Sequence, residues 1–259
     1  MKPQLSIIIV SYKVKDLLEK CLDSIYRNQG DLTVEVFVVD NASSDGTTEM
    51  VNKRFPQSHL IASDRNLGFA RANNLAIKQA AGEYVLLLNP DTEIFPDTLS
   101  KSLAAAKRHS TCGVLGVQMV YPDGRLQPSV RRLPTLWPVI LMLLKLPKLF
   151  PHLKSIGHYL AEDFDYTKEQ AVEQVMGAFM LIPRIVLDKV GLLDERFFVW
   201  FEEVDFCRRV SRAGYKIIYT PETKIVHYGG KSFGQQKVVT NQWRFFKSAL
   251  LYFIKNSLS

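Results

Sequence analysis

Polar side chains follow three short apolar runs in the first hundred residues, each at the point where the run ends. An apolar run that is too short for a helix predicts a strand buried on both faces. In open α/β sheets, ligands bind just beyond the carboxyl ends of the strands, so a ligand or a metal ion is expected at these side chains. The runs and their terminal side chains are residues 5–12 with Ser11, 34–39 with Asp40, and 84–88 with Asn89 and Asp91.

A helical pattern follows each of these runs, over residues 14–26, 47–55 and 97–109. Strands that alternate with helices at this spacing predict parallel β-α-β units. Right-handed crossovers then bring the three strand ends to one edge of one sheet. Each strand end alone is also explained by a simple turn, such as the Asx-Pro turn at Asn89. Convergence of all three on one edge favours a binding site.

A second group of acids, Glu202, Glu203 and Asp205, follows an aromatic run at the predicted start of a helix. The helix dipole favours acids in a first turn, which alone would explain them. However, Glu202 and Glu203 are adjacent like charges among aromatic side chains, and such surroundings raise the pKa of a carboxyl group and suit a general base. His227 follows a short predicted strand, residues 224–226, and is either a structural histidine or a metal ligand.

Length and composition set the outer limits. A chain of 259 residues with 47% hydrophobic content is long enough for one large domain with its own core. The three cysteines are scattered without metal-ligand spacing, so we expect buried thiols rather than a disulfide framework. The N-terminus has no secretory signal pattern, and we therefore expect a cytoplasmic protein.

The net charge of +7 is unevenly distributed. Residues 124–161 and 223–259 hold 12 of the 33 basic residues and none of the 26 acidic ones. Both segments are rich in large apolar side chains, but neither has the roughly 20 consecutive apolar residues that span a bilayer. They are suited to an anionic membrane surface, and the alternative is amphipathic helices that pack on the core. Because no nucleic-acid-binding motif accompanies the charge, we expect no nucleic-acid partner.

Several short motifs in fixed order between residues 5 and 234 resemble the family-two inverting glycosyltransferases, most closely their rhamnosyltransferase-like branch. This resemblance implies an α/β, GT-A-like (Rossmann-like) fold with a mostly parallel sheet flanked by helices. The transferase domain would cover residues 1–235, with a basic apolar insertion at about 131–170, and a basic aromatic helix would follow at 236–259. The motifs are residues 8–12, 38–47, 66–69, 87–91, 177–180 and 197–205, together with Asn74 and His227.

The resemblance also implies roles for the residues that match the nucleotide-binding motifs. Asp40 matches the acid that binds the pyrimidine base. Ser11 and Tyr12 match residues that line the nucleoside, and Asn66 and Asn74 match a polar pair near the nucleotide.

The metal site and the base are implied in the same way. Asn89 and Asp91 take the place of the family's Asp-X-Asp motif, so that Asp91 would bind a divalent ion with His227 as a second ligand. Such oxygen-rich sites suit Mg²⁺ or Mn²⁺, and the choice between them stays open. Glu203 falls on the base position, where the family usually has Asp. The candidates for the base therefore remain Glu203, Glu202 and Asp205.

The implied reaction is transfer of a sugar, rhamnose or a related hexose, from a dTDP- or UDP-sugar with inversion. The acceptor would be a polyprenyl-diphosphate-linked or growing cell-surface glycan at the inner face of the cell membrane. The glycine-containing residues 229–236, with Lys231, predict either a lid over the donor or a plain surface loop. A catalytically inactive sugar-nucleotide-binding or scaffold protein is one alternative. A sugar nucleotidyltransferase is another, although these enzymes usually have a Gly-rich phosphate loop after the first strand.

Overall fold

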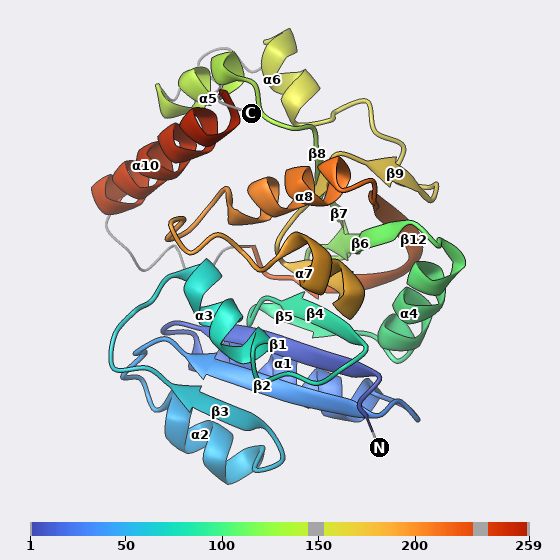
Figure 1. The fold of residues 1–259 in the computed structure, drawn as a ribbon. Coiled ribbons are helices and arrows are strands. Elements are labelled where there is room, and N and C mark those ends of the chain that lie inside the picture. The colour runs from blue at the N-terminus through green and yellow to red at the C-terminus, as the bar shows by residue number, and fades with distance from the viewer. Residues whose placement is uncertain (1, 145–152, 230–237, 258–259) are drawn as a thin grey trace.

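Parallel strands form the first half of a mixed sheet, with β1 between β2 and β4 and with β3 on the outer side of β2. This computed structural model describes residues 2–144, 153–229 and 238–257. The predicted lid, apart from Gly229, therefore lies outside the described residues, as does Lys231. The three strands predicted from apolar runs are confirmed, and they are adjacent (Figure 1). They are β1 (Leu5–Ser11), β2 (Val34–Asp40) and β4 (Tyr84–Leu88), and the structure adds β3 (His59–Ala62), which was not predicted.

Helices connect these strands as predicted. The register pairs Ser11 with Asp40 on β1 and β2, and Ile9 with Leu88 on β1 and β4. The carboxyl ends of the three strands thus lie on one edge, because each crossover returns the chain to the same end of the sheet. The helices of this half are α1 (Lys15–Asn28), α2 (Thr47–Arg54), α3 (Phe69–Ile77) and α4 (Thr98–Arg108).

The second half of the chain extends the same sheet with strands of mixed direction. β11 pairs antiparallel with β4, and β12 pairs parallel with β6 and antiparallel with β5 and β9. The predicted short strand at 224–226 is the end of the long β12. These strands are β5 (Thr92–Ile94), β6 (Cys112–Val120), β7 (Leu126–Gln127), β9 (Gln170–Val172), β11 (Phe179–Pro183) and β12 (Lys216–His227), with β8 (Val130–Arg131) and β10 (Gln174–Val175) forming a separate pair.

Five further helices complete the described fold. The predicted helix with three acids in its first turn is α8, and it ends with Arg209 and Arg212, so both ends complement the helix dipole. The predicted C-terminal helix is α10, which lies beside α5 (Figure 1). These helices are α5 (Leu136–Leu143), α6 (Lys154–Tyr159), α7 (Arg184–Val190), α8 (Glu202–Arg212) and α10 (Val238–Ser257).

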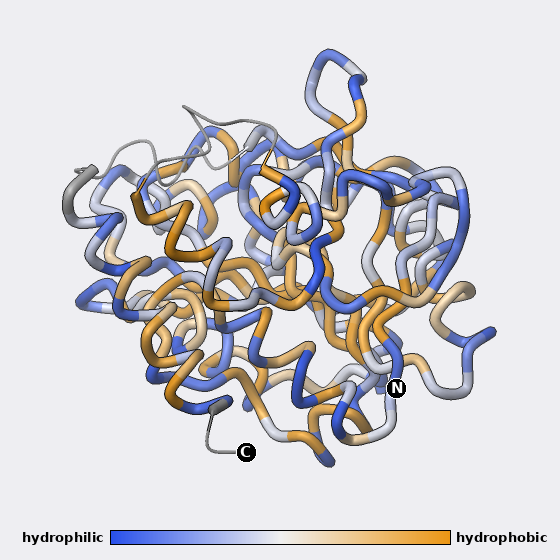
Figure 2. Tube along the Cα trace, turned by 90° about the horizontal axis from the view of Figure 1, so that it is seen from above, coloured by the Kyte–Doolittle hydropathy of each residue, from blue (hydrophilic) through white to orange (hydrophobic). Residues whose placement is uncertain are grey.

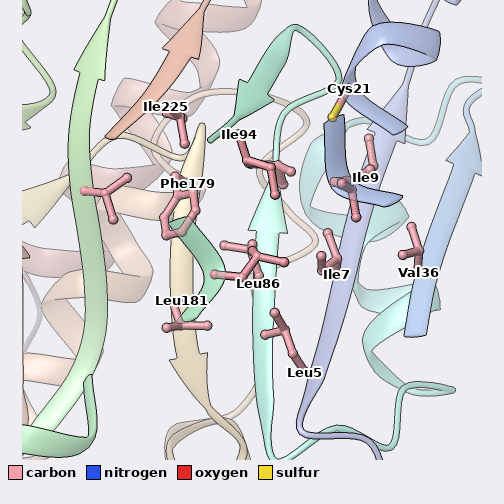
Figure 3. Close-up of a cluster of buried hydrophobic side chains, with 14 of the residues drawn as sticks. Leu5, Ile7, Ile9, Cys21, Val36, Leu86, Ile94, Phe179, Leu181 and Ile225 are labelled. Carbon is pink, nitrogen blue, oxygen red and sulfur yellow. The ribbon is translucent and has the colours of Figure 1, made fainter. Parts of the chain in front are cut away.

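Alternate side chains of the central strands enter two cores on opposite faces of the sheet. Leu5, Ile7 and Ile9 of β1 pack with α1 and α4 (Figure 3), whereas Ile8 packs on the other face with α3, α7 and α8. Each fully buried Leu or Ile side chain stabilises the fold by about 1.5–3 kcal/mol. These two cores fix the strand ends from which the polar side chains project.

Hydrophobic residues dominate the strands in the interior, and hydrophilic residues dominate the surrounding loops (Figure 2). The three cysteines are buried and free, as expected. Within the described ranges, no helix combines the length and the apolar character that crossing a bilayer requires.

Candidate active site

A cavity of about 570 Å³ opens at the carboxyl ends of the parallel strands. It collects residues from distant parts of the chain because the strand ends, the start of α8 and the end of β12 meet there. Seven of the predicted site residues line it. They are Tyr12, Asn66, Asn89, Asp91, Glu202, Glu203 and His227.

Asp91 and His227 lie together on one side of this cavity. The pairing of β5 with β12 places Thr92 opposite His227, and the Tyr228 amide donates to the carbonyl of Asp91 at 2.9 Å. The His227 Nε2 atom lies 3.5 Å from Asp91 Oδ1, and the two side chains are only 6% and 2% exposed. Sequence analysis predicted both as metal ligands, and the structure brings them together.

Gln127 determines which nitrogen of His227 faces Asp91. Its Oε1 atom lies 2.9 Å from His227 Nδ1, an arrangement that favours the tautomer in which the Nδ1–H group donates a hydrogen bond to the amide oxygen. Nε2 is then left with a lone pair that has no hydrogen-bond partner among the described residues. A buried imidazole lone pair beside a buried carboxylate is an arrangement that a divalent cation would satisfy. The described residues contain no larger cluster of His, Cys, Asp or Glu suited to a metal.

Glu202 and Glu203 lie on the other side of the cavity. They begin α8 directly after Trp200 and Phe201, which both have left-handed backbone angles, φ 65° and φ 70°. Two successive non-glycine residues in this region form a strained turn that the surrounding packing must hold. The turn directs both glutamates into the cavity. One oxygen of each, Oε2, is buried without a hydrogen-bond partner in the described part of the chain.

Burial raises the pKa of both carboxyl groups. For Glu202 the charge of Glu203 adds to the effect of burial, and its pKa lies well above the ordinary value, whereas the pKa of Glu203 is raised chiefly by burial. Two adjacent buried carboxylates repel each other, so their ionising together is unfavourable. Glu203 is the more accessible of the pair. This arrangement leaves Glu203 as the carboxylate that can ionise and accept a proton from a ligand in the cavity.

Two of the motifs predicted to bind the nucleotide form a hydrogen-bonded wall of the cavity. Asn41 donates to Asn66 Oδ1 at 3.0 Å and accepts from the Leu67 amide at 2.7 Å. Gly68 has φ +80°, and a Cβ atom there would lie 2.3 Å from the Phe198 carbonyl oxygen. A glycine is therefore required where this loop meets the segment that leads to Glu202.

Two of the predicted nucleoside residues, Ser11 and Asp40, are buried beside this wall and do not line the cavity. Ser11 Oγ has no hydrogen-bond partner in the described residues. The carboxylate of Asp40 accepts bonds from the Ser43 amide and the Thr48 hydroxyl at 3.2 and 3.0 Å. Asp40 therefore orders the loop after β2.

Asn74 and Asp205 are not brought to the cavity. The Asn74 side chain is buried and bonds to the backbone of Leu193 in both directions, so it ties α3 to the segment before α8. Asp205 is 1% exposed and is paired with Arg209 at 2.9 Å and with Lys255 at 2.7 Å. It joins α8 to α10 and does not face the ligand space.

Other residues line the cavity that sequence reasoning did not identify. Most come from the hairpin and insertion between β6 and β11, which was interpreted only as a membrane-facing or packing segment. No local motif marks these residues, since their approach depends on how the insertion folds back over the sheet. They include Tyr121, Gln127, Arg131, Tyr159 and Gln174, together with Arg244 from α10.

Comparison with known proteins agrees with this geometry. The model of glycosyl transferase family 2 matches residues 6–169. An N-acetylglucosaminyl-diphospho-decaprenol L-rhamnosyltransferase of Mycobacterium tuberculosis is 30% identical over 246 residues, which cover 91% of this chain and 79% of that protein. The rhamnosyltransferase WbbL of Escherichia coli is 27% identical over 240 residues, covering 86% of this chain and 82% of WbbL.

A solved structure with a similar fold is the mannosyltransferase PcManGT from Pyrobaculum calidifontis in complex with GDP-Man and Mn²⁺. It aligns with a TM-score of 0.61 and 20% identity, over 97% of this chain and 70% of the other. The predicted GT-A-like fold is thus confirmed. The family-model match and the mycobacterial relative, together with this fold, show that the protein is a glycosyltransferase and belongs to glycosyl transferase family 2.

Proposed function

We propose that this glycosyltransferase moves rhamnose or a related hexose, with inversion, from a dTDP- or UDP-sugar to a polyprenyl-diphosphate-linked or growing cell-surface glycan. The observation that carries the proposal is the pairing, within one cavity, of Glu203 with the Asp91–His227 couple. The names of the relatives support the sugar and the acceptor, because the mycobacterial enzyme is a rhamnosyltransferase that is named for a diphospho-decaprenol substrate.

Asp91 and His227 would hold a divalent cation, Mn²⁺ or Mg²⁺, with further oxygens from the donor diphosphate. The unpartnered Nε2 of His227 beside Asp91 fits this role. When bound, such an ion supplies positive charge that stabilises the leaving nucleoside diphosphate. The chain's own contribution is to fix both ligands on buried strand ends and to set the tautomer of His227 through Gln127.

Glu203 would remove the proton from the acceptor hydroxyl as that oxygen attacks the anomeric carbon. Of the three acids that line the cavity, Asp91 faces His227, and Glu202 is more deeply buried than Glu203. No second carboxylate is then left to form a covalent sugar intermediate. The proposal is therefore a single displacement, which inverts the anomeric centre.

The test is release of free nucleoside diphosphate from dTDP-rhamnose and from UDP-sugars, with a farnesyl-diphosphate-linked N-acetylglucosamine as acceptor and with or without Mn²⁺. Release that requires both acceptor and metal supports the proposal. If nucleotide binds but no diphosphate is released, the inactive sugar-nucleotide-binding protein is favoured. Formation of a sugar nucleotide from a sugar phosphate and a nucleoside triphosphate would instead indicate a nucleotidyltransferase.

Replacing Gln127 by leucine is expected to weaken Mn²⁺ binding about 10- to 100-fold, which is the usual effect of removing a residue that orients a metal-binding histidine. Without the amide oxygen, Nδ1 of His227 loses its acceptor, and the proton can move to Nε2. The measurement is Mn²⁺ affinity by electron paramagnetic resonance in the presence of UDP. Gln118 offers a matched control, since it lies on β6 and does not line the cavity. Equal Mn²⁺ affinity in Gln127→Leu and the wild type would contradict this role.

We further propose that residues 1–235 carry the transferase and that residues 236–259 help it to lie on the inner face of the cell membrane. Nine large apolar side chains are exposed in the described residues, and seven of them lie on or next to α5 and α10. On α10 they recur every three or four positions and therefore share one face, beside Lys247, which lies over the Trp243 ring. The seven are Leu136, Trp137, Leu144, Trp243, Phe246, Leu250 and Ile254.

A variant with Trp243, Leu250 and Ile254 all changed to serine is expected to bind anionic vesicles at least about tenfold more weakly, because each buried methylene contributes about 0.8 kcal/mol. Changing Lys247 to glutamine should remove about 1 kcal/mol more at low salt. Cosedimentation with phosphatidylglycerol vesicles provides the measurement. Ile185→Ser is the matched control, since Ile185 is 66% exposed on α7, away from this face. Unchanged vesicle binding, or a dimer that the triple variant dissociates, would make this face a protein contact instead.

A further inference from the structure

Arg131 brings a positive charge to the cavity on the side of the glutamates. It is the last residue of β8, and its partner in register on β10 is Gln174; both residues line the cavity. β10 packs against α8, which begins with Glu202 and Glu203. Arg131 thus lines the cavity from the strand that neighbours β10, which itself packs against α8.

No carboxylate forms an ion pair with Arg131 within residues 2–144, 153–229 and 238–257. Its guanidinium donates to the carbonyl oxygen of Val130 at 2.7 Å. The next residue, Arg132, differs in that it is paired with Asp163 at 2.7 Å. A half-buried guanidinium that lines a cavity without a carboxylate partner is suited to an anionic group on a ligand, since planar guanidinium groups bind phosphate with two parallel hydrogen bonds.

Tyr159 connects Arg131 with the base. It ends α6 and lines the same cavity. Burial, followed by the charge of Glu203, raises the pKa of Tyr159 to about 12, and the charge of Arg131 opposes that rise. The tyrosine therefore lies within electrostatic range of both side chains, bonds to the side chain of Gln174, and keeps its proton near neutral pH. A cation, a hydroxyl donor and a carboxylate base thus share one end of the cavity.

The position of Arg131 separates two possible anions. The donor diphosphate is proposed to lie at Asp91 and His227, at the ends of β4 and β12. The acceptor must instead bring a hydroxyl group to Glu203. If the acceptor sugar is linked to phosphate through its anomeric carbon, the phosphate lies about one sugar ring away from that hydroxyl. A second guanidinium, Arg244, lines the cavity from α10, whose outer face is apolar. A lipid tail that leaves the cavity along α10 would keep its phosphate near both arginines.

On this basis we propose that Arg131 and the Tyr159 hydroxyl form a phosphate subsite for the acceptor, which makes the enzyme select acceptors whose sugar is linked through phosphate. The inference rests on the proposed function, and it names the residues that recognise the acceptor. Both residues come from the insertion, so this segment determines acceptor choice as well as any contact with a membrane.

The test is binding of farnesyl diphosphate to the protein saturated with UDP and Mn²⁺, which occupy the donor site. Titration calorimetry on Arg131→Gln is expected to show about 10- to 100-fold weaker binding, the range for loss of a charge-assisted hydrogen-bond pair. Arg131→Lys should recover part of the lost affinity for farnesyl diphosphate, and Tyr159→Phe should lose less affinity than Arg131→Gln. The matched control is Arg125→Gln, which removes the same charge from an exposed position outside the cavity. Farnesol, the uncharged probe, should bind equally to all variants.

Three results would overturn the subsite. Weaker binding of UDP to Arg131→Gln would assign the arginine to the donor, and an equal loss for farnesol would make its role structural. Unchanged binding of farnesyl diphosphate to a folded Arg131→Gln variant would remove the role altogether. Binding of farnesyl diphosphate does not require turnover, so it tests the phosphate subsite even if the protein is catalytically inactive. Failure of the proposed function appears separately, as absence of nucleoside diphosphate release from the wild type.

Discussion

Replacing Glu203 by glutamine is expected to lower kcat by about 10²- to 10⁴-fold, the contribution of a positioned general base. The amide has the same size as the carboxyl group, so the cavity and the donor site keep their shape, but it cannot accept the acceptor proton. We therefore expect unchanged affinity for UDP or dTDP. The measurements are steady-state transfer and titration of the nucleoside diphosphate.

The pH profile gives an independent check on this base. Burial raises the pKa of Glu203 above its ordinary value, and only the ionised form can accept a proton. Activity should therefore rise with pH, with a midpoint above the pKa of an ordinary glutamate. This rise should be absent in the Glu203→Gln variant. The same shift has a cost in stability, because a group with a raised folded-state pKa stabilises the fold when protonated and loses that contribution as pH rises through the folded pKa.

Asp205→Asn provides the contrast. Asp205 is buried and paired with Arg209 and Lys255, so its loss should lower the melting temperature and leave kcat of the folded protein close to normal. An active Glu203→Gln together with a folded but inactive Asp205→Asn would show that the base has been assigned to the wrong acid. If neither change affects turnover, neither acid is the base, and Glu202 is the candidate that is left.

Asp91→Asn is expected to reduce transfer by about 10³-fold or more, because the metal ion supplies several kcal/mol of charge stabilisation in such reactions. Asparagine keeps the shape but removes the negative charge next to His227. Mn²⁺ binding in the presence of UDP, measured by electron paramagnetic resonance, should fall with activity, and circular dichroism should show an intact fold.

Glu93→Gln is the matched control for Asp91→Asn. Glu93 lies two residues away on β5, and its carboxylate accepts a hydrogen bond from the Tyr228 hydroxyl outside the cavity. This variant should bind Mn²⁺ and transfer sugar as the wild type does. Full wild-type activity in excess chelator would rule out a metal-dependent mechanism, and normal Mn²⁺ affinity in Asp91→Asn would remove Asp91 as a metal ligand.

The sequence allowed the strand ends to be predicted because their signals are local. Apolar runs identify the strands, and the handedness of the crossovers brings Asp91 to the same edge as the other strand ends. Helical geometry could also have separated Glu203 from Asp205, since two residues along a helix turn the side chain by about 200°. The roles of Arg131, Tyr159 and Gln127 could not be predicted, because they depend on long-range packing of an insertion that has no pattern of its own.

The pairing of β5 with β12 has a consequence for how the enzyme matures. Asp91 and His227 come from distant parts of the chain and meet only when these strands pair. Contacts between segments far apart in the sequence carry a loop-closure cost that must be met before the contact stabilises the fold. A partly folded chain in which β1, β2 and β4 have paired but β5 and β12 have not would lack the proposed Asp91–His227 metal site. On the proposed mechanism, activation of the sugar nucleotide would thus wait for the pairing of β5 with β12.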